Sequence, residues 1–258
     1  MTEDPGVVAR LRAAGCVFAE EEAQLLAAAA RTPDELGELV ERRVQGLPLE
    51  QVVGWAEFCG LRILVDPGVF VPRRRSEFLV DTAIAGAIAP HPLILDLCCG
   101  TGALGLAVAA KLRTAELHAA ELDPAAVRCA RRNVEPAGGH VYEGDLFAPV
   151  PAALRGRVTT LLCNAPYVPS DEIPFLPAEA RDYEHHVALD GGADGLGVLR
   201  RAADEAPGWL APGGRLLVET SDRQTAAMAD VMTGAGLAAR VHENEEYGSA
   251  VVTGTRSA

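Results

Sequence analysis

The amino-acid sequence predicts a doubly wound α/β sheet preceded by a small helical domain and a β-hairpin, and three observations carry this prediction. From residue 92 onward, short apolar runs typical of buried parallel strands alternate with helix-forming segments. The first 48 or so residues are rich in Ala, Leu, Glu and Arg, which favour helices. Between these regions, apolar residues spaced by glycine and proline are typical of a hairpin. We expect a helical domain at 1–50, a hairpin linker at 51–75 and an α/β domain at 76–258.

Composition is that of a soluble globular protein. The chain has 258 residues, enough for one large domain and a small appendage, with 49% hydrophobic and 23% charged residues. The formal net charge of −13 repels phosphate backbones, which disfavours tight sequence-independent binding of nucleic acid.

The cysteines and the N-terminus indicate a reducing compartment. The six cysteines form no C-x-x-C pair and no zinc-finger spacing, so we expect no metal site. Met1 to Asp4 is acidic and begins no signal peptide, and no apolar stretch reaches the roughly 18 residues that a membrane helix needs. We therefore expect a cytoplasmic protein without a membrane partner.

The N-terminal region contains three expected helices, at 7–14, 19–30 and 33–45. Thr32 is expected to cap the third helix, with Pro33 at its first position and Glu35 completing a capping box. Gly46 and Pro48 are expected to end it. Two interpretations stay open for this region, a domain that recognises a substrate and a helical appendage without chemistry.

A basic run follows the expected hairpin at 54–70. Arg73 to Arg75 open a helix that is expected to continue to about residue 87. Such a run is usually a solvated face, but in an acidic chain these arginines could instead meet an anionic group.

The remaining elements alternate as a doubly wound sheet requires. Strands are expected at 93–97, 115–120, 141–142, 159–163, 215–219, 237–242 and 250–255. Helices are expected at 103–112, 124–133, 196–209 and 222–235.

A glycine-rich turn lies between the first strand and its helix. Gly100, Gly102 and Gly105 form a G-x-G-x-x-G pattern, which lets a ligand approach the backbone near the free N–H groups of a helix N-terminus. This pattern fits both a nicotinamide dinucleotide and S-adenosylmethionine. Glu121, at the end of the second strand, could hold ribose hydroxyls in either case.

Two acidic residues favour S-adenosylmethionine. Asp96 ends the first strand, where a carboxylate attracts the ammonium of a methionyl group but repels a pyrophosphate. Asp145 follows the third strand and could accept from an adenine amino group, with Leu146 beside the ring. The predicted cofactor-binding residues are Asp96, Cys98, Gly100, Thr101, Gly102, Glu121, Leu122, Asp145, Leu146 and Asn164.

The fourth strand ends in a tetrapeptide suited to modifying a planar nitrogen, Asn164-Ala165-Pro166-Tyr167. An amide nitrogen is a poor nucleophile because its lone pair is delocalised into the carbonyl. The Asn164 side-chain oxygen and the Ala165 carbonyl could accept from both N–H groups and orient the nitrogen. Pro166 fixes the loop, and Tyr167 can pack on the flat face of the amide. These four residues are the predicted catalytic group.

Together these motifs resemble the HemK-type protein-(glutamine-N5) methyltransferases. The resemblance runs from about residue 41 to the C-terminus and covers 49–54, 58–61, 65–73, the glycine loop, 121–124, 164–167, 181–184 and 189–192. It implies a class I, Rossmann-like methyltransferase fold and S-adenosylmethionine as cofactor. It also implies that the helical domain binds the substrate, a glutamine-containing loop in a protein such as a peptide chain release factor.

The chain departs from the family pattern at three places. Ala165 replaces the usual proline, Cys98 and Cys99 replace the usual Gly-Thr, and 73–77 reads Arg-Arg-Arg-Ser-Glu instead of Arg-Pro-x-Thr-Glu. Ala165 retains a backbone carbonyl, so the amide chemistry survives. A release factor and another protein both remain candidate targets, and the sequence does not specify an oligomeric state.

Other classes of function fit less well. An amino-methyltransferase of adenine or guanine would use the same Asn-x-Pro-Tyr logic but would need base flipping and phosphate contacts, which the negative charge opposes. A catalytically silent cofactor-binding scaffold would not need the full set of Asp96, Glu121, Asp145 and Asn164.

Overall fold

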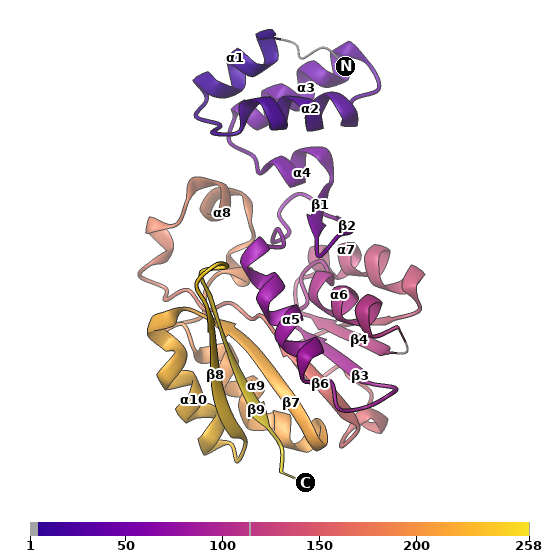
Figure 1. Ribbon diagram of the computed structural model, residues 1–258. Helices are drawn as coiled ribbons and strands as arrows, with labels where there is room; N and C mark the ends of the chain where they lie inside the picture. The colour runs from indigo at the N-terminus through magenta and orange to yellow at the C-terminus, as the bar shows by residue number, and fades with distance from the viewer. Residues whose placement is uncertain (1–4, 114, 258) are drawn as a thin grey trace.

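A computed structural model describes residues 5–113 and 115–257, so the acidic start at 1–4 lies outside the described residues. Three helices, α1 (Pro5–Ala13), α2 (Ala19–Ala29) and α3 (Pro33–Val44), form a small unit with its own apolar core, set apart from the sheet (Figure 1). Thr32 caps α3 as expected, because its hydroxyl accepts from the Glu35 N–H at 3.1 Å. The Glu35 carboxylate accepts from the N–H of Arg31, one residue before the expected partner.

A short helix and a hairpin connect this unit to the sheet. The helix α4 (Leu49–Val53) was not expected, and it ends at Gly54, whose φ of 83° is in the left-handed region. Strands β1 (Trp55–Phe58) and β2 (Leu61–Leu64) then pair antiparallel, which confirms the hairpin.

Among the described residues, seven strands form one sheet in the order β5-β4-β3-β6-β7-β9-β8. Their bounds are β3 Leu93–Leu97, β4 Glu116–Glu121, β5 His140–Glu143, β6 Val158–Cys163, β7 Leu210–Thr220, β8 Ala238–Asn244 and β9 Ser249–Thr255. The first five of these strands are parallel, and β9 pairs antiparallel with β7 and β8. The doubly wound α/β prediction is confirmed.

Helices cover both faces of the sheet. One face packs against α5 (Glu77–Ala85), α6 (Ala103–Leu112) and α7 (Pro124–Val134). The other packs against α9 (Gly197–Trp209) and α10 (Thr225–Gly234). None of the helices within 5–113 and 115–257 is long and apolar enough to cross a membrane.

The segment between β6 and α9 reaches back to the N-terminal helices. It contains a helix that the sequence did not predict, α8 (Ala178–Tyr183), which lies below the N-terminal helices in Figure 1. The buried Arg43 donates to Glu22 at 2.7 Å and to Glu179 of α8 at 2.6 Å. The Tyr183 hydroxyl donates to the Gln45 carbonyl at 2.6 Å. These contacts join the helical unit to α8.

Candidate active site

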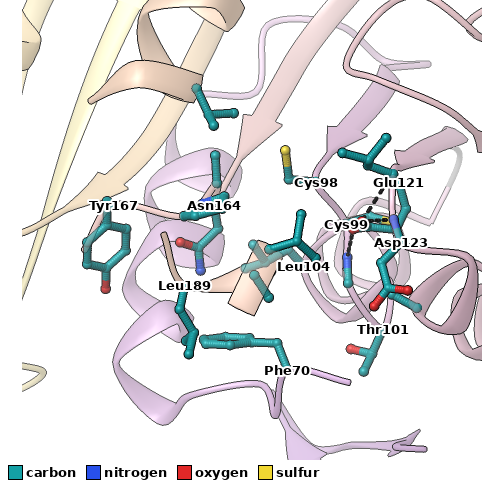
Figure 2. A pocket seen from close by; sticks show the side chains of 18 of the residues that line it. Phe70, Cys98, Cys99, Thr101, Leu104, Glu121, Asp123, Asn164, Tyr167 and Leu189 are labelled. Atoms are coloured by element: carbon teal, nitrogen blue, oxygen red, sulfur yellow. Dashed lines mark hydrogen bonds between the residues drawn. The ribbon is translucent and has the colours of Figure 1, made fainter. Parts of the chain in front are cut away.

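A cavity of about 410 Å³ opens at the carboxyl ends of the parallel strands, where open α/β sheets bind their ligands. Its wall contains most of the residues predicted from the sequence, namely Cys98, Gly100, Thr101, Glu121, Leu122, Asp145, Leu146, Asn164, Ala165, Pro166 and Tyr167. Asp96 and Gly102 lie outside this wall. Figure 2 shows Asn164, Tyr167 and Leu189 on one side of the pocket and Glu121, Cys99 and Asp123 on the other.

Glu121 braces the loops around the cavity. Its carboxylate accepts from three backbone N–H groups, those of Gly100 at 2.8 Å, Leu122 at 2.7 Å and Asp123 at 2.9 Å. Burial raises the pKa of Glu121 above its usual range, while these hydrogen bonds oppose the shift. Glu121 therefore fixes the glycine-rich turn in addition to facing the cavity.

The glycines of the turn have different roles. Gly100 has a φ of +56°, and a Cβ on it would meet nothing within 4 Å, so its surroundings leave room for a ligand. At Gly102 a Cβ would lie 2.5 Å from Val134 of α7, and at Gly105 it would lie 2.7 Å from Leu117 of β4. These two glycines let α6 pack closely against its neighbours.

Asp96 lies behind the turn. It is fully buried, and its Oδ2 accepts from the Gly105 N–H at 2.9 Å. Its Oδ1 has no hydrogen-bond partner among the described residues. Burial raises the pKa of Asp96 to about 7. The side chain is thus a buried carboxyl group that a cationic ligand would favour in its ionised form.

Asp145 has a partner that the sequence did not predict. Its Oδ2 is 2.5 Å from an Nη atom of Arg201 on α9, and both residues line the cavity. Leu146 is buried beside them with a φ of 47°. This end of the cavity combines an apolar surface with an oriented carboxylate.

The amide of Asn164 is held from its nitrogen side. Nδ2 lies 3.3 Å from the Ser76 hydroxyl and 3.5 Å from Oε2 of Glu219. Among the described residues, no group donates to Asn164 Oδ1 or to the Ala165 carbonyl. Two hydrogen-bond acceptors of adjacent residues in the cavity wall therefore remain available.

Glu219 is a site residue that the sequence analysis missed. Its side chain is only 2% exposed, and it accepts from the Tyr167 hydroxyl at 3.0 Å. Burial and the Glu219 charge together raise the pKa of Tyr167, so the hydroxyl stays protonated. A signal was present in the sequence, because Glu219 follows the apolar run 216–218 near the carboxyl end of β7. Asp96 and Glu121 lie in the same way at or next to the carboxyl ends of β3 and β4.

Comparisons with known proteins show which proteins this chain is similar to. The family model "Methyltransferase small domain" matches residues 60–174. The release factor glutamine methyltransferases of Geobacter sulfurreducens and Streptomyces coelicolor are each 39% identical, covering 72% of this chain and 66% and 67% of those proteins. The chain therefore spans about two thirds of their length. A 4-amino-L-phenylalanine/4-methylamino-L-phenylalanine methyltransferase of Streptomyces pristinaespiralis is 35% identical, covering 79% of this chain and 71% of that protein.

A solved structure supports the fold. The methyltransferase from Pyrococcus furiosus superposes with a TM-score of 0.60 over 84% of this chain and 98% of that chain, at 17% sequence identity.

Proposed function

The chain belongs to the release factor glutamine methyltransferase family, and we propose that it transfers the methyl group of S-adenosylmethionine to the side-chain amide nitrogen of a glutamine in a protein. The observation that carries the proposal is a pair of acceptors in the cavity wall, Asn164 Oδ1 and the Ala165 carbonyl, to which no described residue donates. A glutamine amide presents two N–H donors to such a pair. The names of the relatives support a peptide chain release factor as the methylated protein.

The cavity fits S-adenosylmethionine by the chemistry of its walls. In the wall, Glu121 supplies a carboxylate at the end of β4 and Asp145 a carboxylate beside the apolar Leu146. Behind the wall, Asp96 adds a buried carboxyl oxygen that has no hydrogen-bond partner among the described residues. Gly100 leaves room next to the backbone. Carboxylates suit a ligand that carries ammonium and sulfonium charges, whereas a pyrophosphate would be repelled.

When bound, this cofactor supplies a methyl group on a positively charged sulfur. Asn164 and the Ala165 carbonyl would accept from the two amide N–H groups and hold the nitrogen in line with that methyl group, so most of the catalysis is positioning. Tyr167 is held by Glu219 and can pack against the planar amide. The acceptors also stabilise the positive charge that develops on the nitrogen.

We propose that the N-terminal region, 1–50, recognises the protein substrate, that 51–75 links it to the catalytic part and that 76–258 carries the transfer. Val17 and Phe18 support this role, because they are 82% and 66% exposed at the turn before α2. Large exposed apolar side chains that lie together are typical of protein contact sites. Arg43 of α3 also joins the helical unit to Glu179, which lines the cavity.

Replacing Phe18 by serine is expected to raise the KM for the protein substrate roughly tenfold, because about 1.4 kcal/mol of apolar burial is lost at a contact site. The affinity for S-adenosylmethionine should be unchanged in calorimetry. Ile88→Ser is the matched control, since Ile88 is 54% exposed and lies outside the helical region. An unchanged KM in Phe18→Ser would exclude this surface from substrate recognition.

The affinity for S-adenosylmethionine is expected to rise with pH across neutrality. Below pH 7 the Asp96 carboxyl is protonated in the free protein, and above it the group is ionised and attracts a cation. If the cofactor lowers this pKa by about one unit, the affinity rises toward a limit of roughly tenfold between about pH 5 and about pH 8. Calorimetry at several pH values measures this, with Asp96→Asn as the variant that should lose the dependence. A wild-type affinity that does not change with pH would contradict the role of Asp96.

To test the proposed function, the protein is incubated with S-adenosylmethionine that carries a labelled methyl group, together with one of three acceptors. These are a release factor, nucleic acid and 4-amino-L-phenylalanine, the compound in the name of one relative. Label in the release factor, located by mass spectrometry on a glutamine side chain, is the expected result. Label in nucleic acid alone would establish the base-methylating alternative, which none of these relatives favours.

A further inference from the structure

The basic run at 73–75 meets anionic groups of the protein itself. Arg73 donates to both carboxylate oxygens of the buried Glu184, at 2.6 and 2.7 Å. Arg74 and Arg75 are both exposed, but only Arg75 of these two also lines the cavity, where it pairs with Glu219 at 3.2 Å. The two outer arginines of the run are therefore part of the site and not of a solvated face.

Arg75 closes a triangle of polar contacts at the acceptor side of the cavity. Its Nη2 donates to the Tyr167 hydroxyl at 2.6 Å, and its Nε donates to Glu219 Oε1. The Tyr167 hydroxyl in turn donates to the same Oε1 at 3.0 Å. The guanidinium also lies 5.8 Å from the centre of the Tyr167 ring. Each member of the triangle is thus held by the other two.

We propose that Arg75 is a positioning residue for methyl transfer, which sets the Tyr167 ring and, through Glu219, the orientation of the Asn164 amide. This inference rests on the proposed function. In this proposal Arg75 does not touch the reacting atoms itself. It acts through Tyr167 and Asn164, whose side chains would touch the acceptor.

The physical reason lies in the buried carboxylate. Glu219 uses Oε1 for Arg75 and Tyr167, which leaves Oε2 to face Asn164 Nδ2 at 3.5 Å. Without the guanidinium, this carboxylate would keep its burial but lose its only cationic partner among the described residues. It could then rotate or take up water, and the Asn164 amide could turn its nitrogen toward the acceptor. An amide in that orientation offers a donor where the reaction needs an acceptor.

Arg75→Ala is expected to lower kcat for the protein acceptor roughly 10- to 100-fold, because small misplacements of a catalytic group cost this much. The Kd for S-adenosylmethionine should stay within about twofold, since the cofactor half of the cavity is untouched. Arg75→Lys should recover only part of kcat, because an ammonium can pair with Glu219 but lacks the planar fork that bonds both partners. Arg74→Ala is the matched control, an exposed arginine one residue away, and should keep the wild-type kcat.

A double-mutant cycle separates positioning from a merely structural effect. In a Tyr167→Phe background, which lacks the hydroxyl, Arg75→Ala should lower kcat clearly less than in the wild type. Full additivity, or a kcat for Arg75→Ala equal to that of Arg74→Ala, would overturn the proposal. If Arg75→Ala does not fold by circular dichroism, Arg75→Lys replaces it in the same cycle. If the wild type methylates an acceptor other than glutamine, the proposed function fails, and the cycle is run on that acceptor to decide the role of Arg75 separately.

Discussion

Asn164→Ala is expected to lower kcat roughly 10²- to 10³-fold, about 3–4 kcal/mol, by analogy with the loss of a positioned polar group that stabilises charge in a transition state. The substitution removes Oδ1, the side-chain acceptor proposed to orient the glutamine nitrogen. The Kd for S-adenosylmethionine should barely change, because Asn164 is bonded to Ser76 and Glu219 on the acceptor side. Single-turnover kinetics with labelled cofactor, combined with calorimetry, measures both quantities.

Asn164→Asp separates the acceptor role from the loss of volume. A carboxylate also accepts from N–H groups, so this variant should be less damaging than alanine even though it lies near Glu219. Near-normal turnover in Asn164→Ala would refute the assigned role.

Glu121→Ala is expected to weaken S-adenosylmethionine binding roughly 100-fold or more. Two effects contribute. Each lost charge-assisted hydrogen bond to the ribose costs about 1–3 kcal/mol, and the glycine-rich turn loses the carboxylate that holds it in place. The brace consists of the bonds from Gly100, Leu122 and Asp123. Calorimetry with S-adenosylmethionine and S-adenosylhomocysteine measures the effect.

The control for this variant lies on the neighbouring strand. Glu143 pairs in register with Glu121 at the end of β5 but is exposed, so Glu143→Gln should leave the affinity unchanged. An affinity of Glu121→Ala equal to that of the control would remove Glu121 from the site, and tight binding of NADH instead would overturn the cofactor assignment.

The helices and strands that could be predicted from the sequence are those determined by residues close together in the chain. Thr32 caps α3 through the Glu35 N–H, three residues away. The buried strands β3 and β6 read as apolar runs because both faces of the sheet are covered by helices. The short helices α4 and α8 escaped prediction because five or six residues carry too little periodic pattern and are held mainly by tertiary contacts.

The same distinction holds for the residues of the candidate site. The glycine turn and the tetrapeptide at 164–167 are contiguous in the chain, so their composition suffices to find them. Arg75 and Glu219 are 144 positions apart and meet because α5, which begins just after Arg75, packs against β7. The residues next to Arg75 and Glu219 in the sequence do not predict that the two side chains pair. Asp96 was expected to face the ligand directly, and only the close packing at Gly105 reveals that it stands behind the turn.

Gly100, Gly102 and Gly105 have different surroundings, and this difference limits what a G-x-G-x-x-G pattern says about the bound ligand. Gly102 and Gly105 have no room for a Cβ because Val134 and Leu117 lie against them, whatever the turn binds. Two of the three glycines in the G-x-G-x-x-G pattern are therefore required by the close packing of α6 against its neighbours. Only Gly100 opens toward free space. A chain could keep the spacing by architecture alone, so the information about the ligand resides in the acidic strand ends that surround the turn.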